Sequence, residues 1–253
     1  MGKLDNKVAI VTGAGQGVGR GIALALAKEG AYIVVAEINE ETANSTVNEL
    51  RSLGTKAIAV TCDVSKYEDV NKVVQTTIDE YGTIDILVNN AQAVPAVNVP
   101  FEEITDEDWD VTLGSGLMGT FYFMKACLPH MKEKGGKIIN LASAAGSQRM
   151  MGFTPYSATK EAIRAITGVA GREWGKYGIN VNVICPSANS PGMLQWKENF
   201  PEQYQGLMMQ IPLGRIGDCE EDIGRTVVFL ASSDSDYITG QTINIDGGTD
   251  IHS

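Results

Sequence analysis

The chain has 253 residues, of which 43% are hydrophobic and 20% are charged, a composition typical of globular proteins. Its formal net charge of −11 repels polyanions, so nucleic acid and anionic membrane surfaces are not expected partners. No apolar run reaches the ~20 residues that a membrane-spanning helix needs, and the first residues do not resemble a secretion signal, which together predict a cytoplasmic protein. Because the chain has two histidines and four widely separated cysteines, neither a metal site nor a disulfide framework is expected.

Short apolar runs alternate with longer amphipathic segments along the chain. Continuous apolar runs are typical of buried parallel strands, and apolar residues three and four apart are typical of helices. In chain order the pattern predicts strand 8–11, helix 17–29, strand 32–36, helix 40–53, strand 57–61, helix 67–81, strand 84–88, helix 106–134, strand 137–140, helix 155–177, strand 180–184, helix 220–230 and strand 241–245. We therefore expect one α/β domain over residues 1–253, a Rossmann-type doubly wound fold whose seven-stranded parallel sheet is flanked by helices.

Two of these helices are preceded by the sequence pattern of a capping box. Ser65 is followed three residues later by Glu68, and Thr105 is followed by Asp108. In a capping box the hydroxyl and the acid each bind a free backbone N–H of the first helical turn. The pattern predicts that both helices begin at these residues.

A glycine-rich loop, TGAGQGVG at 12–19, connects the first predicted strand to the first predicted helix. Backbone can approach a pyrophosphate closely at such a turn, where the helix N-terminus also favours negative charge. The spacing is not a strict GxGxxG, so a purely structural glycine turn is the alternative. About 20 residues further on, Glu37 ends the second strand, where a carboxylate accepts hydrogen bonds from the adenosine ribose hydroxyls. A solvated strand end is the alternative for Glu37.

The surroundings of Glu37 bear on which dinucleotide is preferred. A carboxylate at this position repels a 2′-phosphate, and the neighbouring Gln16 and Ile38 supply no cation to bind one. The sequence therefore predicts NAD rather than NADP as the cofactor.

Tyr156 and Lys160 lie four residues apart near the start of a predicted helix, so their side chains share one face. A free tyrosine with a pKa near ~10 is rarely ionised at neutral pH, but a nearby ammonium and a positively charged nicotinamide both favour the phenolate. A YxxxK pair by itself is usually a surface coincidence. Here it follows a strand that ends at Ser143, whose hydroxyl can polarise a substrate carbonyl.

Further motifs extend this pattern over nearly the whole chain. They are TGAGQGVG at 12–19, Asp63, NNA at 89–91, Ser143, YSATK at 156–160, INVNVICP at 179–186 and ITGQTINIDGG at 238–248. In this order they resemble the short-chain dehydrogenase/reductase family. The resemblance implies that Asp63 contacts the adenine amine and that Asn90 supports the central strand and the cofactor.

The resemblance also implies the catalytic roles and the assembly. Ser143 orients the substrate oxygen, Tyr156 transfers the proton, and Lys160 holds the nicotinamide ribose while lowering the pKa of the phenol. A homotetramer is the expected assembly. The implied cofactor-binding residues are Gly13, Gln16, Gly17, Val18, Gly19, Glu37, Asp63, Val64, Asn90, Ala91, Tyr156, Lys160 and Pro186.

The chain departs from the family pattern at several positions. An active-site asparagine is expected seven residues after Trp109, where this chain has Gly116. Ser115, a differently placed water or backbone carbonyls would have to replace it in the proton relay. The motif NNAG becomes NNAQ, with Gln92 at its end, and Ser187 follows Pro186 in place of glycine. A catalytically impaired protein that still binds NAD is the alternative that these departures raise.

The same departures are similar to a subgroup that contains bacterial 12α-hydroxysteroid dehydrogenases. The segment 187–212 is rich in methionine and aromatic residues and follows a strand's carboxyl end, where we expect a substrate loop. A lid packed on its own domain or on a neighbouring subunit is the alternative. The sequence thus favours a hydrophobic secondary alcohol or ketone, with an acyl-carrier-protein reductase as the competing function. The candidate substrate-binding residues are Gln92, Ser143, Met150, Met193 and Trp196.

Overall fold

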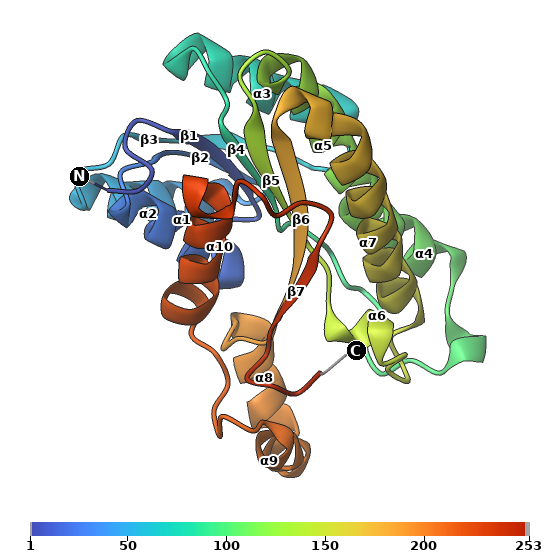
Figure 1. Cartoon of the computed structure of the whole chain (residues 1–253). Helices are drawn as coiled ribbons and strands as arrows, with labels where there is room; N and C mark the ends of the chain where they lie inside the picture. The colour runs from blue at the N-terminus through green and yellow to red at the C-terminus, as the bar shows by residue number, and fades with distance from the viewer. Residues whose placement is uncertain (1, 251–253) are drawn as a thin grey trace.

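The computed structural model describes residues 2–250, and a seven-stranded sheet forms its centre (Figure 1). The strand order is β3-β2-β1-β4-β5-β6-β7, and every neighbouring pair is parallel. The strands are β1 (Val8–Thr12), β2 (Tyr32–Glu37), β3 (Ala57–Thr61), β4 (Ile86–Asn89), β5 (Gly136–Leu141), β6 (Ile179–Pro186) and β7 (Thr242–Ile245). The predicted fold class is confirmed.

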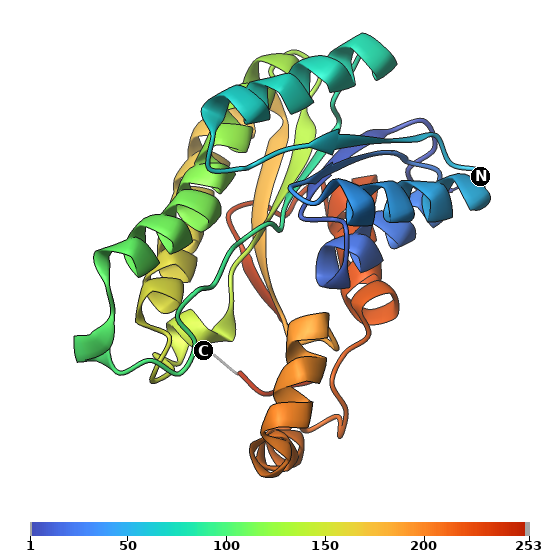
Figure 2. The ribbon, with the colours of Figure 1, turned by 180° about the vertical axis from the view of Figure 1, so that it is seen from behind.

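Helices cover both faces of the sheet, as the two opposite views show (Figures 1 and 2). Helices α1, α2 and α10 cover one face, and α3, α5 and α7 cover the other. The α-helices are α1 (Gly17–Lys28), α2 (Glu40–Ser52), α3 (Tyr67–Tyr81), α4 (Asp106–Leu113), α5 (Gly119–Met131), α6 (Ala144–Ser147), α7 (Thr154–Trp174), α8 (Pro191–Asn199), α9 (Pro201–Gln210) and α10 (Arg225–Ala231). Short 3₁₀ or π segments are η1 (Phe101–Glu103), η2 (Gly114–Met118), η3 (Gly175–Tyr177), η4 (Cys219–Gly224) and η5 (Ser233–Ser235).

The alternation of side chains along each strand creates two cores. In β1, Ala9 and Val11 pack into the core under α1, α2 and α10, whereas Ile10 between them packs into the core under α3 and α5. All three side chains are fully buried. A parallel sheet buried on both faces requires apolar residues at consecutive positions, which explains the continuous apolar runs in the sequence.

The helix predicted over 106–134 is interrupted. Helix α4 ends at Leu113, the π-helical segment η2 follows, and α5 begins at Gly119. The interrupted stretch GSGLMG contains three glycines, which lower the helix propensity of the backbone. Single π-helical turns of this kind often lie at functional sites.

The predicted substrate loop at 187–212 is largely helical. It forms α8 and α9, each with a proline in its first turn, and Ser190 caps α8 by accepting a hydrogen bond from the Met193 N–H at 3.3 Å. The two helices extend away from the sheet, and none of their residues is fully buried (Figure 1). Each of these two helices is short and begins with a proline. Neither has enough apolar residues at helical spacing for the sequence pattern to predict a helix.

One of the two predicted capping boxes is confirmed. The Thr105 hydroxyl accepts from the Asp108 N–H, and the Asp108 side chain accepts from the Thr105 N–H. The prediction for Ser65 is wrong, because its hydroxyl donates to Asp63 at 2.7 Å and α3 begins after Lys66 without a side-chain cap. Since Lys66 is the N-cap, Ser65 lies one residue before the cap and is not placed to accept from the first helical turn.

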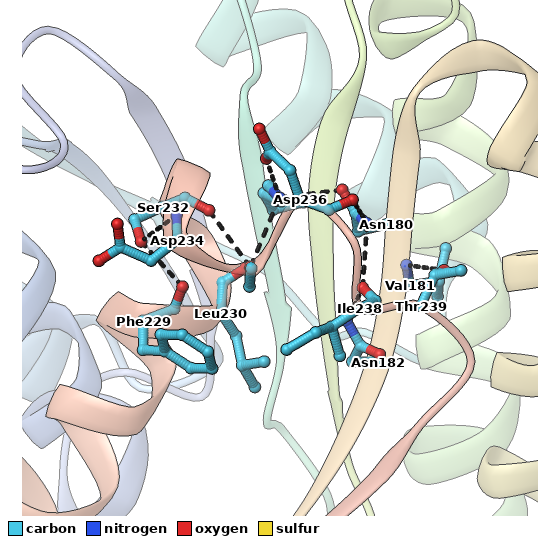
Figure 3. A network of polar contacts seen from close by, with 12 residues as sticks. Asn180, Val181, Asn182, Phe229, Leu230, Ser232, Asp234, Asp236, Ile238 and Thr239 are labelled. Carbon is cyan, nitrogen blue, oxygen red and sulfur yellow. Dashed lines mark hydrogen bonds and ion pairs between the residues drawn. The ribbon is translucent and has the colours of Figure 1, made fainter.

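A polar network attaches the segment before β7 to the start of β6 (Figure 3). The Asn180 Nδ2 donates to the carbonyls of Asp236 at 3.0 Å and Ile238 at 2.9 Å. The Asn182 Nδ2 donates to the same Ile238 carbonyl, and the Thr239 hydroxyl accepts from the Val181 N–H. These bonds satisfy backbone groups of the irregular segment and fix β7 as the last strand of the sheet.

Candidate active site

A cleft of about 920 Å³ lies at the carboxyl ends of β1, β2 and β4. Ligands of doubly wound folds bind at this edge, where the strand order reverses on either side of β1. Nine of the predicted cofactor residues line it: Gly13, Gln16, Gly17, Val18, Glu37, Asp63, Val64, Asn90 and Ala91. Sequence reasoning missed Asp110, Gly192 and other lining residues from α4 and α8, because their approach depends on the folding of distant segments.

The glycine-rich loop has the close packing that a phosphate cradle needs. Gly13 and Gly17 have φ of 62° and 56°, which side chains rarely adopt. A Cβ on Gly19 would lie 2.3 Å from the Gly13 carbonyl oxygen, so this position excludes any side chain. The Asn90 Nδ2 donates to the carbonyls of Thr12 at 2.9 Å and Gly13 at 3.0 Å and so fixes the loop. The residues therefore fit a dinucleotide.

Glu37 ends β2 and its carboxylate closes the adjacent side of the cleft. Its Oε2 accepts from the Gly15 N–H at 3.0 Å, and its Oε1 accepts from the Ile38 N–H at 3.0 Å. Arg20, just after the loop, is occupied by Glu49 of α2, to which its Nε donates at 2.8 Å. Among the residues of the described chain that line the cleft, none is Lys or Arg, whereas Glu37, Asp63 and Asp110 are acidic.

Asp63 follows β3 on the next side of the cleft. Its Oδ1 accepts from both the hydroxyl and the N–H of Ser65, and Lys66 lies 3.2 Å from its Oδ2. The hydrogen bonds from Ser65, with a smaller contribution from Lys66, hold the pKa of Asp63 below its usual value. A carboxylate fixed in this way stays available as a hydrogen-bond acceptor.

The structure brings Ser143, Tyr156 and Lys160 together. Ser143 follows β5 and caps α6, and Tyr156 and Lys160 lie in the first turns of α7. The Lys160 Nζ lies 5.3 Å from the centroid of the Tyr156 ring and donates to the Leu141 carbonyl at 2.8 Å. Ser143 lies close enough to the Tyr156 phenol for its side chain to affect the pKa of that group.

Burial shifts the pKa values of this pair in opposite directions. It raises the pKa of the Tyr156 phenol above its usual value, while the hydrogen bond with Ser143 opposes this rise. Burial lowers the pKa of the Lys160 amine to about 7. The lowered phenol pKa that we expect from Lys160 together with the nicotinamide charge stays a prediction, because desolvation of the ring is the largest influence on Tyr156 in the polypeptide by itself.

Arg164 supports the same cluster and was not recognised from the sequence. It lies one helical turn after Lys160, and its Nη2 donates to the Ser143 carbonyl at 3.0 Å. The spacing of four residues along α7 was the available signal. Ser143 is thus held by its position as a helix cap and by a cation on α7.

Several predicted residues are not among those that line this cleft: Ser143, Tyr156, Lys160, Gly19, Pro186, Met150, Met193 and Trp196. Gly19 is buried in the first turn of α1, and Pro186 ends β6. Met150 is 46% exposed in a turn after α6. Trp196 packs on Tyr204, with ring centroids 6.2 Å apart, so α8 and α9 contact each other through these side chains. This contact lies within the segment, so it does not decide between a substrate loop and a lid packed on its own domain or on a neighbouring subunit.

Gln92 and Ser115 line the cleft beside η2. Ser115, one of the groups considered as a replacement for the missing asparagine, donates from its hydroxyl to the Val111 carbonyl at 2.7 Å. The same hydroxyl accepts from the Ala93 N–H at 3.0 Å. These two bonds fix the loop after β4 against the end of α4.

Two negative findings concern the described residues 2–250. They contain no cluster of side chains that could hold a metal ion, and their four cysteines are unpaired. None of their helices is both long and apolar enough to cross a membrane.

Comparisons with known proteins agree with this geometry. A family model described as enoyl-(acyl carrier protein) reductase matches residues 13–250. The chain is 43% identical to a 12alpha-hydroxysteroid dehydrogenase of a Clostridium species, with 98% of each chain covered. It is 37% identical to a sorbitol dehydrogenase of Cereibacter sphaeroides (97% and 98% covered) and 35% identical to a 3-oxoacyl-acyl-carrier-protein reductase of Thermotoga maritima (97% and 98% covered).

A solved structure shares the whole fold. It is the crystal structure of a proposed short-chain alcohol dehydrogenase from Sinorhizobium meliloti 1021, with a TM-score of 0.92 and 32% identity over 97% of both chains. The relatives differ in the substrates that their names state, but each is similar to this chain over almost its full length. With its glycine-rich loop and its Ser143, Tyr156 and Lys160 cluster, the chain belongs to the short-chain dehydrogenase/reductase family.

Proposed function

We propose that this protein is an NAD(H)-dependent oxidoreductase that interconverts a hydrophobic secondary alcohol and its ketone, with hydroxysteroids as the first candidates. The observation that carries the proposal is the convergence of Ser143, Tyr156 and Lys160 at the carboxyl edge of the sheet. Residues 1–253 act as one dinucleotide-binding and catalytic domain in this proposal. The cytoplasmic location expected from the sequence remains a prediction.

Each side chain has a distinct task. The bound nicotinamide supplies or accepts the hydride. Tyr156 donates a proton to the carbonyl oxygen during reduction and accepts it during oxidation. Ser143 accepts a hydrogen bond from the Ala145 N–H at 3.1 Å, which orients its hydroxyl, and the hydroxyl proton would turn from Tyr156 to the substrate oxygen when substrate binds. Lys160 binds the nicotinamide ribose and, when protonated, favours the phenolate of Tyr156.

The preference for NAD follows from the charge of the cleft. A 2′-phosphate on the adenosine ribose would be repelled by the carboxylate of Glu37, and Asp63 adds a second negative charge to the cleft lining. The lining residues offer no cation to compensate, and Arg20 is paired with Glu49. We therefore expect at least about tenfold higher kcat/KM with NAD(H), equivalent to about 1.4 kcal/mol.

The hydrophobic substrate class rests on two lines of support. The 12alpha-hydroxysteroid dehydrogenase at 43% identity acts on a bulky apolar alcohol by its name. The exposed apolar side chains Met150, Met151 and Leu194 lie in the segments after β5 and β6. The sorbitol dehydrogenase at 37% identity and the 3-oxoacyl-acyl-carrier-protein reductase at 35% identity indicate polyols and acyl-carrier thioesters as alternative substrates.

One screen tests this function. Oxidation of steroidal, cyclic and aromatic secondary alcohols and of sorbitol is measured with NAD⁺ and with NADP⁺, and the corresponding ketones are tested for reduction. We expect turnover of apolar alcohols with NAD⁺. Tyr156→Phe should retain cofactor affinity and lose about 10² to 10⁴ in rate, because its proton transfer is removed. Undiminished turnover by this variant would contradict the mechanism.

The same screen includes the competing functions. An acyl-carrier-protein reductase must bind an acidic carrier, which the net charge of −11 disfavours. Reduction of a 3-oxoacyl-carrier thioester at a higher kcat/KM than any free ketone would favour that function. Binding of NAD without turnover of any compound would favour the catalytically impaired alternative raised by Gly116.

A further inference from the structure

Ser143, which the proposed function places at the substrate oxygen, precedes a helix of only four residues. It is the N-cap of α6, and its Oγ accepts from the Ala145 N–H at 3.1 Å. A helix of one turn has almost no stability of its own, because nucleation is unfavourable and few hydrogen bonds offset it. The position of the Ser143 hydroxyl therefore depends on the contacts that α6 makes with the rest of the molecule.

Arg164 of α7 makes one set of these contacts. Its Nη2 donates to the Ser143 carbonyl at 3.0 Å and to the Ser147 Oγ at 3.4 Å, so one guanidinium group reaches both ends of α6. Its Nε lies 3.0 Å from the Oε1 of Glu161, three residues earlier on α7, and its side chain is 15% exposed. A planar guanidinium serves several acceptors in fixed directions, which a lysine ammonium on a flexible stem does not.

The segment after β7 also contacts α6. The Ser147 hydroxyl lies 2.8 Å from the Asp250 Oδ2 and 3.0 Å from the Ala144 carbonyl, and the carboxylate is the stronger acceptor. Asp250 is 8% exposed, and its backbone N–H donates to the Asp246 Oδ2 at 2.8 Å. Its carbonyl accepts from the Asn244 Nδ2 at 2.8 Å. The Ser147 hydroxyl therefore connects α6 to a fixed acceptor beyond the last strand.

We propose that Arg164, Ser147 and Asp250 are positioning residues that hold α6 in place. Through α6 they fix the point at which the Ser143 hydroxyl meets the substrate oxygen. The segment after β7 is then part of the support of the active site, although it follows Ser143 by about a hundred residues. This inference rests on the proposed function. The three residues transfer no proton or hydride, so they affect the rate only through Ser143.

A double-mutant cycle with Ser143→Ala tests this route. We expect Arg164→Met to lower kcat by about tenfold and to change KM for NAD⁺ by less than about twofold, because only the orientation of the reacting groups suffers. In the Ser143→Ala background the same substitution should lower kcat by less than about twofold, since no hydroxyl is left to position. Arg164→Lys keeps a cation and should lose less than Arg164→Met. Arg172→Met, which changes an exposed arginine of α7, is the control.

Asp250→Asn tests the contact beyond β7. The amide keeps the shape of the side chain but accepts a weaker hydrogen bond from the Ser147 hydroxyl. We expect kcat to fall by about twofold to fivefold, and this loss should also disappear in the Ser143→Ala background. Asp79→Asn, which changes an exposed acid of α3, is the matched control. Equal losses in both backgrounds, for Arg164→Met or for Asp250→Asn, would overturn the route through Ser143.

Hydrogen exchange tests the position of α6 without any activity. Peptides that cover residues 142–150 should exchange faster by about fivefold or more in Arg164→Met and in Asp250→Asn, because α6 opens more often when it loses a contact. Peptides that cover β3 should exchange at the parent rate, which separates local opening from global destabilisation. Unchanged exchange over 142–150 in both variants would overturn the proposal.

The two measurements separate this inference from the proposed function. If the parent turns over no alcohol or ketone, the proposed function fails, and hydrogen exchange still decides whether Arg164 and Asp250 hold α6. If the parent is active but the variants exchange at the parent rate, only the further inference fails.

Discussion

Glu37 shows how one side chain at a strand end sets the chemistry of a cleft. Its two oxygens accept backbone N–H groups from the glycine-rich loop and from the turn after β2, so the carboxylate is fixed where the ribose is expected. A fixed charge discriminates more strongly than a mobile one, because no reorganisation weakens its repulsion of a phosphate. We therefore expect cofactor choice to depend on this residue and on the absence of Lys and Arg from the described cleft lining.

Replacing Glu37 with Ala removes the repulsion and also releases the Gly15 N–H. We expect the ratio of kcat/KM for NAD(H) over NADP(H) to fall by about tenfold, through weaker NAD(H) binding and stronger NADP(H) binding. Steady-state kinetics with both cofactors measure this ratio. Glu80→Ala, which changes an exposed acid of α3 outside the cleft lining, serves as the control. A ratio unaffected by Glu37→Ala would show that Glu37 does not select the cofactor.

Lys160 destabilises the folded protein in a pH-dependent way. Burial lowers its pKa to about 7 in the folded state, whereas its ordinary value is 10.5. Between these values the unfolded chain binds more protons than the folded one, so the stability of the folded state rises with pH. Below about 7 the full cost of the buried charge is present, and above 10.5 it disappears.

Lys160→Met removes this cost. We expect the variant to be more stable than the parent near pH 6 and to lose this advantage by about 1 kcal/mol per pH unit between pH 7 and 10. Thermal unfolding of the cofactor-free proteins across this range provides the measurement. The exposed Lys72→Met should show no such trend. A constant difference between Lys160→Met and the parent would mean that Lys160 is not desolvated.

Elements far apart in the sequence are connected in the core by a chain of amides. The Asn89 Nδ2 at the end of β4 donates to the Asn140 Oδ1 of β5 at 2.8 Å, and the Asn140 Nδ2 donates to the Thr167 hydroxyl of α7 at 2.9 Å. Asn140 and Thr167 are fully buried, and Asn89 is 4% exposed. This chain fixes α7, which carries Tyr156 and Lys160, against the centre of the sheet.

Asn140→Ala breaks both bonds and leaves the Asn89 amide without a partner. We expect a loss of about 2 to 4 kcal/mol in the free energy of unfolding, since each buried unpaired group costs about 1 to 3 kcal/mol. Thr167→Val removes one partner at similar volume and should cost about half as much. Urea unfolding at equal protein concentrations gives both values. A loss of less than 1 kcal/mol for Asn140→Ala would show that the amide chain does not stabilise the core.

On the scale of the whole molecule, the outer face of the α5 and α7 layer exposes apolar side chains. Phe121 of α5 is 44% exposed and Val169 of α7 is 55% exposed. Both helices cover the same face of the sheet (Figures 1 and 2). Exposed apolar side chains on neighbouring helices are suited to burial against another subunit. They support the homotetramer that the family resemblance implies.

We expect light scattering to give four times the chain mass of 27.1 kDa in the micromolar range. The combined substitution Phe121→Asp and Val169→Asp should shift the mass toward smaller species, because burying the new carboxylates is costly. Leu213→Asp, which changes an exposed residue outside these helices, is the control. A parent mass near that of one chain would contradict the prediction.

The amino-acid sequence by itself determined the strands, most of the long helices and the family. Strands buried on both faces need consecutive apolar residues, so all seven were predictable, although β4 begins at Ile86 rather than at the predicted residue 84. The glycine-rich loop and the Tyr156 and Lys160 pair were also predictable. Their function depends on spacing within one short segment, which the covalent chain fixes.

Tertiary structure alone decided what lies around those residues. Gln92 and Gly116 are separated along the chain, and their contact exists only because the loop after β4 packs on η2 and α7. The pairing of Trp196 with Tyr204 arises from packing too. Burial likewise sets the pKa directions of Tyr156 and Lys160, because desolvation depends on every group that surrounds a side chain and no local sequence pattern encodes that environment.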